Sequence, residues 1–442
     1  MRPLLRTAKT GTLAVLALCT GTVLAVPAEA ATTLYVDKSS RACTDVGPGT
    51  AARPFCTLGR AATVATAGQT VLVATGRYAE QLQPRNSGTS GKPITFAAKY
   101  GSNVVITGGT YGVLVSGRSY ITVRGFTIVH TPGSGIYVKS SKRIRLESNR
   151  VAYSGTPGDA KKTARGITLN ATTDSVVKAN VVDHNSDTGI FLGAGTTRVT
   201  VVSNESTRNA REYLRGAAGI DVRGPGNSIV SNRSHDNEDS GIQVRLGGDK
   251  ALVVGNLVWR NGDHGIDVLQ APGVRVVGNT AYGNATAGIN FEGAKPASSG
   301  ARVQNNIAVD NGVNSDRTEG NIRVDDNAKA GTVVDTNLVW LSKPGVMYVW
   351  GTDKHASQTA FAHAEPGQEA NGIEANPRFV DAAKSNFRLQ VSSPAVDSAD
   401  SAASGQLLYD VYLVRRVDVK SVANTGSGPR RYDDRGAVER PS

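Results

Sequence analysis

The 442-residue sequence predicts an all-β fold, a parallel β-helix built as a solenoid of three-strand coils. Two repeated columns of residues carry this prediction. The dipeptide Gly-Ile recurs at Gly135, Gly166, Gly189, Gly219, Gly241, Gly265 and Gly288. Pairs of asparagines five residues apart begin at Asn180, Asn204, Asn232, Asn256, Asn279 and Asn306. The shortest spacing between Gly-Ile pairs is 22 residues, and such a period with short apolar runs between polar corners indicates a solenoid.

The residue types favour a β-helix over a leucine-rich horseshoe. A leucine-rich repeat needs leucines at fixed offsets and a helical stretch, whereas these units contain short β-branched runs such as 199–202 and 274–277. Equivalent residues of successive coils would stack at the strand spacing of about 4.8 Å. Stacked asparagines at a bend would then satisfy each other's amides. We expect the glycine before each isoleucine to give the backbone a sharp turn into the next strand.

The elements follow in order along the chain. Residues 31–93 differ from the repeats and predict an N-terminal cap, with a strand, a short helix N-capped near Thr57 and a second strand at 69–73. The cap is expected because a solenoid needs its open end covered. The β-helix repeats are expected over 94–340, and residues 341–442, where the pattern dissolves, predict an irregular C-terminal capping segment.

The start of the chain predicts export. Residues 1–30 combine a basic start, an apolar stretch and a small-residue cleavage site, which indicates a secretory signal peptide and a secreted, extracellular protein. Only Cys43 and Cys56 remain after cleavage, and one disulfide is the default for such a pair in an oxidising compartment. Removing the three basic residues and one acid of the leader takes the formal net charge from +12 to +10.

Composition also limits the partners. The basic charge is compatible with a polyanion, but no basic stretch is interleaved with aromatic residues, so we expect no nucleic acid partner. No segment beyond the leader is apolar enough to span a bilayer, so we expect no membrane partner. We expect a monomer.

Short segments near both ends resemble a known family. Residues 35–37, 53–55 and 376–381 resemble the caps of secreted right-handed parallel β-helix proteins, a group that includes pectate lyases of polysaccharide lyase family 9. The resemblance covers nearly the whole mature chain. It implies a right-handed helix and an enzyme that acts on a polysaccharide.

Outward-facing residues of the coils are the candidates for chemistry. Counted from each Gly-Ile glycine as zero, side chains at +1 and +3 point into the core and those at +2 and +4 point outward. The +2 column reads Tyr137, Thr168, Phe191, Asp221, Gln243, Asp267 and Asn290. The +4 column includes Arg223, Arg245 and Glu292, and the residues just before the strands include Asp239, Asp263 and His264. The middle coils therefore gather acids and arginines on one face.

Three of these acids predict a calcium site. Asp239 and Asp263 occupy one column of adjacent coils, about 5 Å apart, and would repel each other unless a cation lies between them. In family 9 lyases a D-D-G-x-D pattern holds the catalytic calcium. The resemblance implies this role for Asp263 and Asp267, with His264 in place of one aspartate. We expect Asp239, Asp263 and Asp267 to ligate calcium.

The family's catalytic lysine has no counterpart. Its position falls on Asn290, which cannot act as a base, so Arg245, Lys295 or His264 must replace it. We expect a calcium-assisted polysaccharide lyase that cleaves an anionic, uronate-containing glycan by β-elimination. The expected catalytic residues are Arg245, His264, Lys295, Asp221 and Glu292, and the expected substrate-binding residues are Arg223, Gln243, Asn290 and Phe191.

Two other functions fit the same face. The surplus of carboxylates suggests an inverting glycoside hydrolase, because Asp221 and Asp267 lie two coils apart, about 9.6 Å between backbones. A non-catalytic carbohydrate-binding or cell-wall scaffold would use its acids only as turn formers. We expect a turn-forming role for Asp183, Asp187 and Asp236 in any case.

Overall fold

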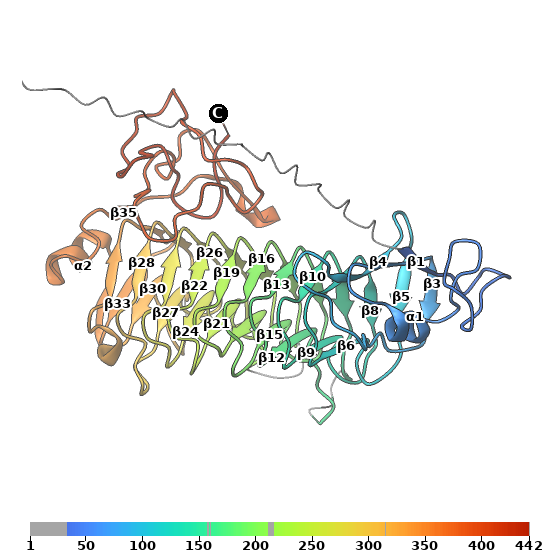
Figure 1. Cartoon of the computed structure of the whole chain (residues 1–442). Helices are drawn as coiled ribbons and strands as arrows, with labels where there is room; N and C mark the ends of the chain where they lie inside the picture. The colour runs from blue at the N-terminus through green and yellow to red at the C-terminus, as the bar shows by residue number, and fades with distance from the viewer. Residues whose placement is uncertain (1–32, 157–158, 160, 211–215, 314, 442) are drawn as a thin grey trace, which may run out of the picture. The chain divides into compact units, whose positions relative to one another are not determined.

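The computed structural model describes residues 33–156, 159, 161–210, 216–313 and 315–441. The predicted signal peptide lies outside these residues. The described chain from Thr33 onward winds into a parallel β-solenoid with three long sheets (Figure 1). In that part of the chain no helix has the length and hydropathy to cross a membrane.

Each coil contributes one strand to each sheet, so the strands of a sheet come from successive coils. Sheet 1 contains β1 (Thr33–Val36), β2 (Thr70–Val73), β4 (Ile94–Ala98), β7 (Ile121–Arg124), β10 (Arg145–Glu147), β13 (Val176–Lys178), β16 (Thr200–Val202), β19 (Ser228–Val230), β22 (Leu252–Val254), β25 (Arg275–Val277), β28 (Arg302–Gln304) and β31 (Val333–Asp335). Sheet 2 contains β3 (Gly76–Tyr78), β5 (Val104–Ile106), β8 (Thr127–Val129), β11 (Arg150–Ala152), β14 (Val181–Asp183), β17 (Glu205–Thr207), β20 (Arg233–His235), β23 (Leu257–Trp259), β26 (Thr280–Tyr282), β29 (Ile307–Val309), β32 (Leu338–Trp340) and β35 (Ile373–Glu374). Sheet 3 contains β6 (Val113–Ser116), β9 (Ile136–Lys139), β12 (Ile167–Asn170), β15 (Ile190–Leu192), β18 (Ile220–Val222), β21 (Ile242–Val244), β24 (Ile266–Val268), β27 (Ile289–Phe291), β30 (Ile322–Val324), β33 (Tyr348–Trp350) and β34 (Asp353–His355).

The N-terminal part caps the solenoid and also begins it. Helix α1 (Leu58–Val64) starts where expected, because the Thr57 hydroxyl accepts a hydrogen bond from the Arg60 backbone N–H. The strands around it, β1 and β2, already belong to sheet 1, so residues 31–93 contain the first strands of the solenoid as well as the cap. The disulfide between Cys43 and Cys56 is present, with Cα atoms 5.0 Å apart.

The short helix η1 (Asp326–Ala328) lies within the last coils, between β30 and β31. The C-terminal part contains helix α2 (Gln358–Ala364), the short helix η2 (Ala382–Lys384) and an antiparallel pair, β36 (Phe379–Asp381) and β37 (Asn386–Leu389). This segment packs on sheet 2. Phe387 and Val438 bury Leu257 and Trp259 in one apolar cluster. The segment therefore covers the flank of the solenoid as well as following its last coil.

The core is built from the predicted inward columns. The isoleucine after each repeated glycine, from Ile136 to Ile289, has no exposed surface, and neither do the +3 residues from Val138 to Phe291. Both columns belong to the main apolar cluster. The predicted alternation of inward and outward side chains in sheet 3 is thus confirmed.

The asparagine pairs form two buried ladders, also as predicted. Asn256, for example, donates its side-chain N–H to Asn279 Oδ1 at 2.9 Å and accepts the Asn232 side chain at 3.0 Å. It also donates to the Ile229 carbonyl at 2.9 Å. Each amide therefore joins three coils, because a stacked column offers a donor below every acceptor.

The expected reason for the repeated glycines is wrong. None of the glycines from Gly135 to Gly288 that precede an isoleucine has a positive φ. A Cβ at Gly265 would instead lie 2.8 Å from the Asn284 side-chain nitrogen and 2.5 Å from the Gly288 carbonyl oxygen. Glycine is required at these positions because a side chain would clash with the asparagine ladder. The left-handed turns fall on other corner residues.

Candidate functional site

The outward column of sheet 3 has the predicted register. Phe191 pairs with Asp221, Asp221 with Gln243, Gln243 with Asp267, and Asp267 with Asn290, on the neighbouring strands β15, β18, β21, β24 and β27. Asp221 and Asp267 are therefore two coils apart. The structure adds Arg323 of β30 as the next member of the column.

A chain of hydrogen bonds links the later members of this column. Both oxygens of Asp267 are occupied, since Oδ2 accepts from Gln243 at 2.9 Å and Oδ1 accepts from Asn290 at 2.8 Å. Asn290 Oδ1 in turn accepts from Arg323 at 2.8 Å. The Asp267 side chain is 3% exposed. This carboxylate is thus locked in place by amide donors and positions its neighbours.

Asp221 is equally enclosed. Arg223 donates to both of its oxygens, at 2.8 Å for the shortest contact, and the Asp221 side chain is only 1% exposed. Burial raises the pKa of Asp221 despite that partner. The Arg223 guanidinium lies 5.1 Å from the centre of the Phe191 ring, and Arg165 lies 3.8 Å from it. This end of the face presents arginines over an aromatic ring rather than a free carboxylate.

His264 lies between two acids, as predicted. Its Nδ1 is 3.3 Å from Asp263 and 3.9 Å from Asp267, and its Nε2 bonds the Thr318 hydroxyl at 3.0 Å. Asp263 also accepts from the Thr286 hydroxyl at 2.6 Å. Thr318 could not be predicted from the repeat pattern, because it comes from a loop two coils later in the chain. This loop brings Arg317 as well, whose guanidinium lies 3.2 Å from Asp263.

Glu292 is the half-buried acid of the face. Burial raises its pKa from 4.5 to about 7, and the negative charge of Asp267 adds to the effect. A carboxyl group with a pKa near neutrality can either accept or donate a proton at physiological pH. Among the predicted site residues, Glu292 combines partial exposure with proton-transfer chemistry.

Hydrogen-bond donors of other residues contact the three predicted calcium ligands. Asp267 faces two amides and Asp263 faces a hydroxyl, a guanidinium and an imidazole, while Asp239 Oδ1 accepts from the Ser240 backbone N–H at 2.7 Å. Over the described residues, no three His, Cys, Asp or Glu side chains group in a way that could hold a metal ion. This donor set does not fit a calcium shell, and no step proposed below passes through a metal.

The remaining candidates lie at the rim. Arg245 follows β21 and is half-buried, and no ion pair to it occurs within the described chain. Lys295 is exposed on the turn after β27, where its carbonyl accepts from Gln270 at 2.5 Å. Arg245 therefore lies on the outward face of the middle coils, whereas Lys295 lies beyond the strand.

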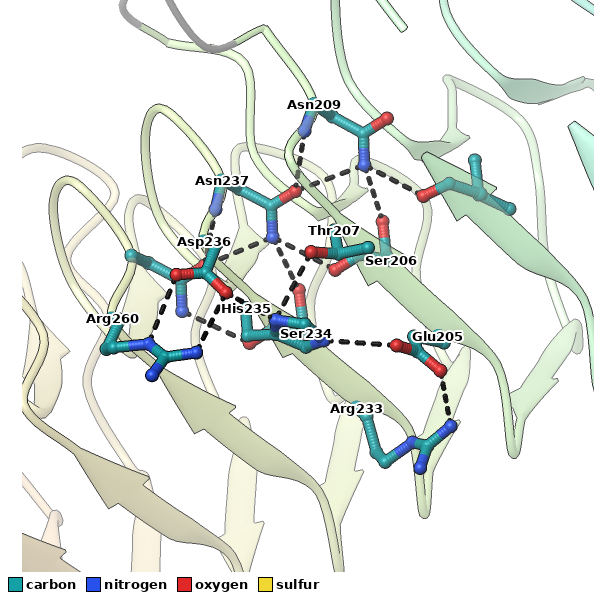
Figure 2. Close-up of polar contacts among 12 residues, drawn as sticks. Glu205, Ser206, Thr207, Asn209, Arg233, Ser234, His235, Asp236, Asn237 and Arg260 are labelled. Atoms are coloured by element: carbon teal, nitrogen blue, oxygen red, sulfur yellow. Dashed lines mark hydrogen bonds and ion pairs between the residues drawn. The ribbon is translucent and has the colours of Figure 1, made fainter. Parts of the chain in front are cut away.

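A second polar cluster, which the repeat pattern did not predict, lies on sheet 2 (Figure 2). His235 Nδ1 lies 2.7 Å from Asp236, and its Nε2 lies 3.2 Å from Glu205 of the preceding coil. Arg233 pairs with Glu205 and Arg260 with Asp236, so that positive and negative groups alternate. Asp236 has a positive φ of 54°, so it forms a turn as expected and also belongs to this network. Predicting this cluster would have required knowing that β17 pairs with β20.

Comparison with known proteins places the fold. The family model described as right handed beta helix region matches residues 90–214 and 207–356, which is more than half of the chain. The chain belongs to this family. It is 24% identical to the uncharacterized protein YwoF of Bacillus subtilis (strain 168) over 433 residues, which cover 82% of this chain and 92% of YwoF.

Two solved structures share the right-handed solenoid at low identity. Pectate lyase Pel9A aligns with a TM-score of 0.55 and 19% identity over 93% of this chain and 98% of that one. The complex of XylC with xylose aligns with a TM-score of 0.53 and 12% identity over 92% and 99% of the two chains. At these identities the likeness shows the fold, and function must be argued from the site.

Proposed function

We propose that the protein is a secreted enzyme that cleaves an anionic, uronate-containing polysaccharide on the outward face of sheet 3, by β-elimination. The observation that carries the proposal is Glu292, a half-buried carboxyl group whose pKa is raised to about 7 by burial and by the negative charges of Asp267 and Asp325. The fold family includes polysaccharide-active proteins such as pectate lyase Pel9A, which supports the substrate class. The disulfide between Cys43 and Cys56 suits an oxidising, extracellular setting.

Two arginines lie on this face before and after Glu292 along the solenoid axis. Arg323 belongs to the next coil and Arg245 to the second coil before it. Arg323 is engaged with Asn290 and Asp325, whereas Arg245 is open to a ligand carboxylate. We assign Arg245 the role of neutralising the uronate carboxylate, which makes the C5 proton of the sugar more acidic.

The elimination then needs one proton-transfer group. The ionised Glu292 takes the C5 proton, the C5–H electron pair forms the C4=C5 double bond, and the C4–O4 bond breaks. The leaving oxygen takes a proton from water or from the Glu292 carboxyl group formed in the first step. Asp267 and His264 act as positioning residues, because both are nearly buried and the charge of Asp267 helps to set the pKa of Glu292.

The same carboxyl group favours a second candidate, a glycoside hydrolase. In its protonated form Glu292 could donate a proton to the glycosidic oxygen while water attacks the sugar. The two reactions require opposite ionisation states of Glu292. A lyase gains activity as pH rises through about 7, and a hydrolase loses it over the same range.

A panel of uronans, including pectate and alginate, tests the proposal. A lyase produces ultraviolet absorbance from the new double bond, with a kcat/KM that rises through neutral pH, and Glu292→Gln abolishes both. New reducing ends without absorbance, together with a falling pH profile, would establish the hydrolase instead. Binding without turnover on every glycan would reject both reactions and support a carbohydrate-binding scaffold.

A further inference from the structure

A separate charged surface lies where each coil turns from sheet 3 into sheet 1. The corner residue of this turn has a left-handed backbone in coil after coil. In chain order the corner residues are Arg143, Asp174, Arg198, Gly226, Lys250, Gly273 and Gly300. They stack one above the other because the strands that follow them pair in register, as β22 does with β25 and β25 with β28.

In the earlier coils two cations at this corner are paired with acids. Arg198 binds Asp174 of the preceding coil through two hydrogen bonds, of 2.7 and 3.0 Å. Arg145 lies at the start of β10, two residues after the corner residue Arg143, and pairs with Glu147. Arg145 and Arg198 thus each have a carboxylate partner.

The corresponding cations of the later coils have no such ion pair within the described chain. A groove of about 330 Å³ is lined by Lys250, Gly273, Arg275, Gly300 and Arg302, without a carboxylate. Within the described chain, no ion pair involves Lys250, Arg275 or Arg302. Arg275 and Arg302 face each other in register on β25 and β28, so two like charges stand about 4.8 Å apart at their backbones, which is an unfavourable pairing.

The floor of the groove is open backbone. A Cβ at Gly300 would meet nothing within 4 Å, and one at Gly273 would meet only the Lys250 side chain, at 3.3 Å. Arg302 is held in place because it donates to the carbonyls of Ala301 and Gly331, at 3.0 and 2.8 Å. A ligand can therefore approach three cations over a floor without side chains.

We propose that this groove, defined by Lys250, Arg275 and Arg302, is a second binding site for an anionic polysaccharide. Acidic groups of the polymer, carboxylate or sulfate, would lie along the solenoid axis and meet one cation in each of three coils. The groove has no aromatic lining on which bases could stack, so a single-stranded nucleic acid is not the ligand. The site is independent of the reaction at Glu292, because it lies at the corner beyond the outward face of sheet 3.

Binding measurements on the full chain test the groove. The background carries Glu292→Gln so that the ligand is not consumed, and calorimetry at about 0.15 M salt uses oligogalacturonate, dextran sulfate and neutral dextran. The double variant Arg275→Gln/Arg302→Gln should bind the anionic ligands about tenfold more weakly at one class of site, a change of about 1.4 kcal/mol. Neutral dextran should bind to neither form.

The matched control is Arg145→Gln/Arg198→Gln, which removes the same two charges from the ion-paired coils. If both double variants lose affinity equally, net charge explains binding and the groove is refuted. If neither loses affinity, the groove does not bind these polymers. Because Arg302→Gln also removes two backbone contacts, Arg302→Lys keeps the charge and should retain most of the affinity. If Arg245→Gln abolishes all binding while Arg275→Gln/Arg302→Gln leaves it unchanged, the polymer lies only on sheet 3 and the groove is refuted.

Discussion

The imidazole ring of His235 lies flat on the indole ring of Trp259, with ring centres 3.9 Å apart and planes 12° apart. Both imidazole nitrogens face carboxylates, Asp236 at 2.7 Å and Glu205 at 3.2 Å. Burial lowers the pKa of His235, but these contacts outweigh burial and the pKa lies above its usual 6.5. These contacts therefore favour the imidazolium form of the ring, and the aromatic face of Trp259 stabilises that cation further.

The stabilisation that this cluster gives the fold should decrease both in acid and in alkaline solution. The contribution of His235 is complete below pH 6.5 and is lost as pH rises through its raised pKa. The pKa of Glu205 is lowered mainly by His235, and that of Asp236 is about 2, where His235 and Arg260 outweigh burial. Their contributions are complete above their ordinary values of 4.5 and 3.8 and are lost in acid, so the cluster stabilises most between about pH 5 and 6.

We therefore expect His235→Gln to lower the free energy of unfolding by about 2 kcal/mol near pH 6, and by less in alkaline solution. Urea unfolding at several pH values measures the effect. His363→Gln, an exposed change on α2, is the control and should be neutral. A loss that stayed constant from pH 5 to pH 9 would show that packing on Trp259, and not charge, gives His235 its role.

Asn256→Ala should lower the free energy of unfolding by about 3 kcal/mol. The substitution leaves the backbone and side-chain N–H groups of Asn232 without their acceptor in a fully buried ladder. It also removes the side-chain donor to the Ile229 carbonyl and to Asn279 Oδ1. Thermal and urea unfolding measure the loss. Asn327→Ala, which removes one exposed contact to the Gly293 carbonyl, should cost little. Equal effects at the two positions would contradict a structural role for the ladder.

Glu369 lies at the end of one asparagine ladder. Because of this residue, the free energy of unfolding should decrease as pH rises. Its two oxygens accept from the Asn337 side chain at 2.8 Å and the Asn337 backbone N–H at 3.2 Å. Burial outweighs these bonds and raises the pKa from 4.5 to about 7. The folded state therefore holds a proton that the unfolded state releases, and stability is lost as pH rises from about 4.5 to 7. Glu369→Gln should flatten this slope in unfolding curves, and an unchanged slope would exclude Glu369 as its source.

Calcium removal should leave the protein unchanged. Because hydrogen-bond donors occupy both oxygens of Asp267, we expect a chelator to alter neither the melting temperature nor turnover on a uronan. Asp263→Ala/Asp267→Ala should instead lower stability equally with and without calcium. A chelator-dependent loss of activity, restored by calcium and absent from the double variant, would return these acids to the role of metal ligands.

The solenoid, its core and its asparagine ladders follow from the repeat pattern of the chain. A column such as Ile136 to Ile289 repeats at every coil, and parallel pairing places repeated residues above one another whatever the lengths of the connecting loops. The outward order of Asp221, Gln243 and Asp267 followed from the same alternation. The role of the repeated glycines did not follow from the repeat pattern, because the close approach of the Asn284 amide to Gly265 is a contact between coils.

The roles of these outward groups depend on contacts that form only in the folded protein. Facing away from the core does not mean facing water, because Arg223 covers Asp221 and the loop of Arg317 and Thr318 closes over His264. The contacts of His235 with Glu205, and of Trp259 with Phe387, join residues from other coils or from the C-terminal segment. Burial and charge pairing set the pKa of a carboxyl group such as Glu292, and both depend on neighbours that are distant in sequence.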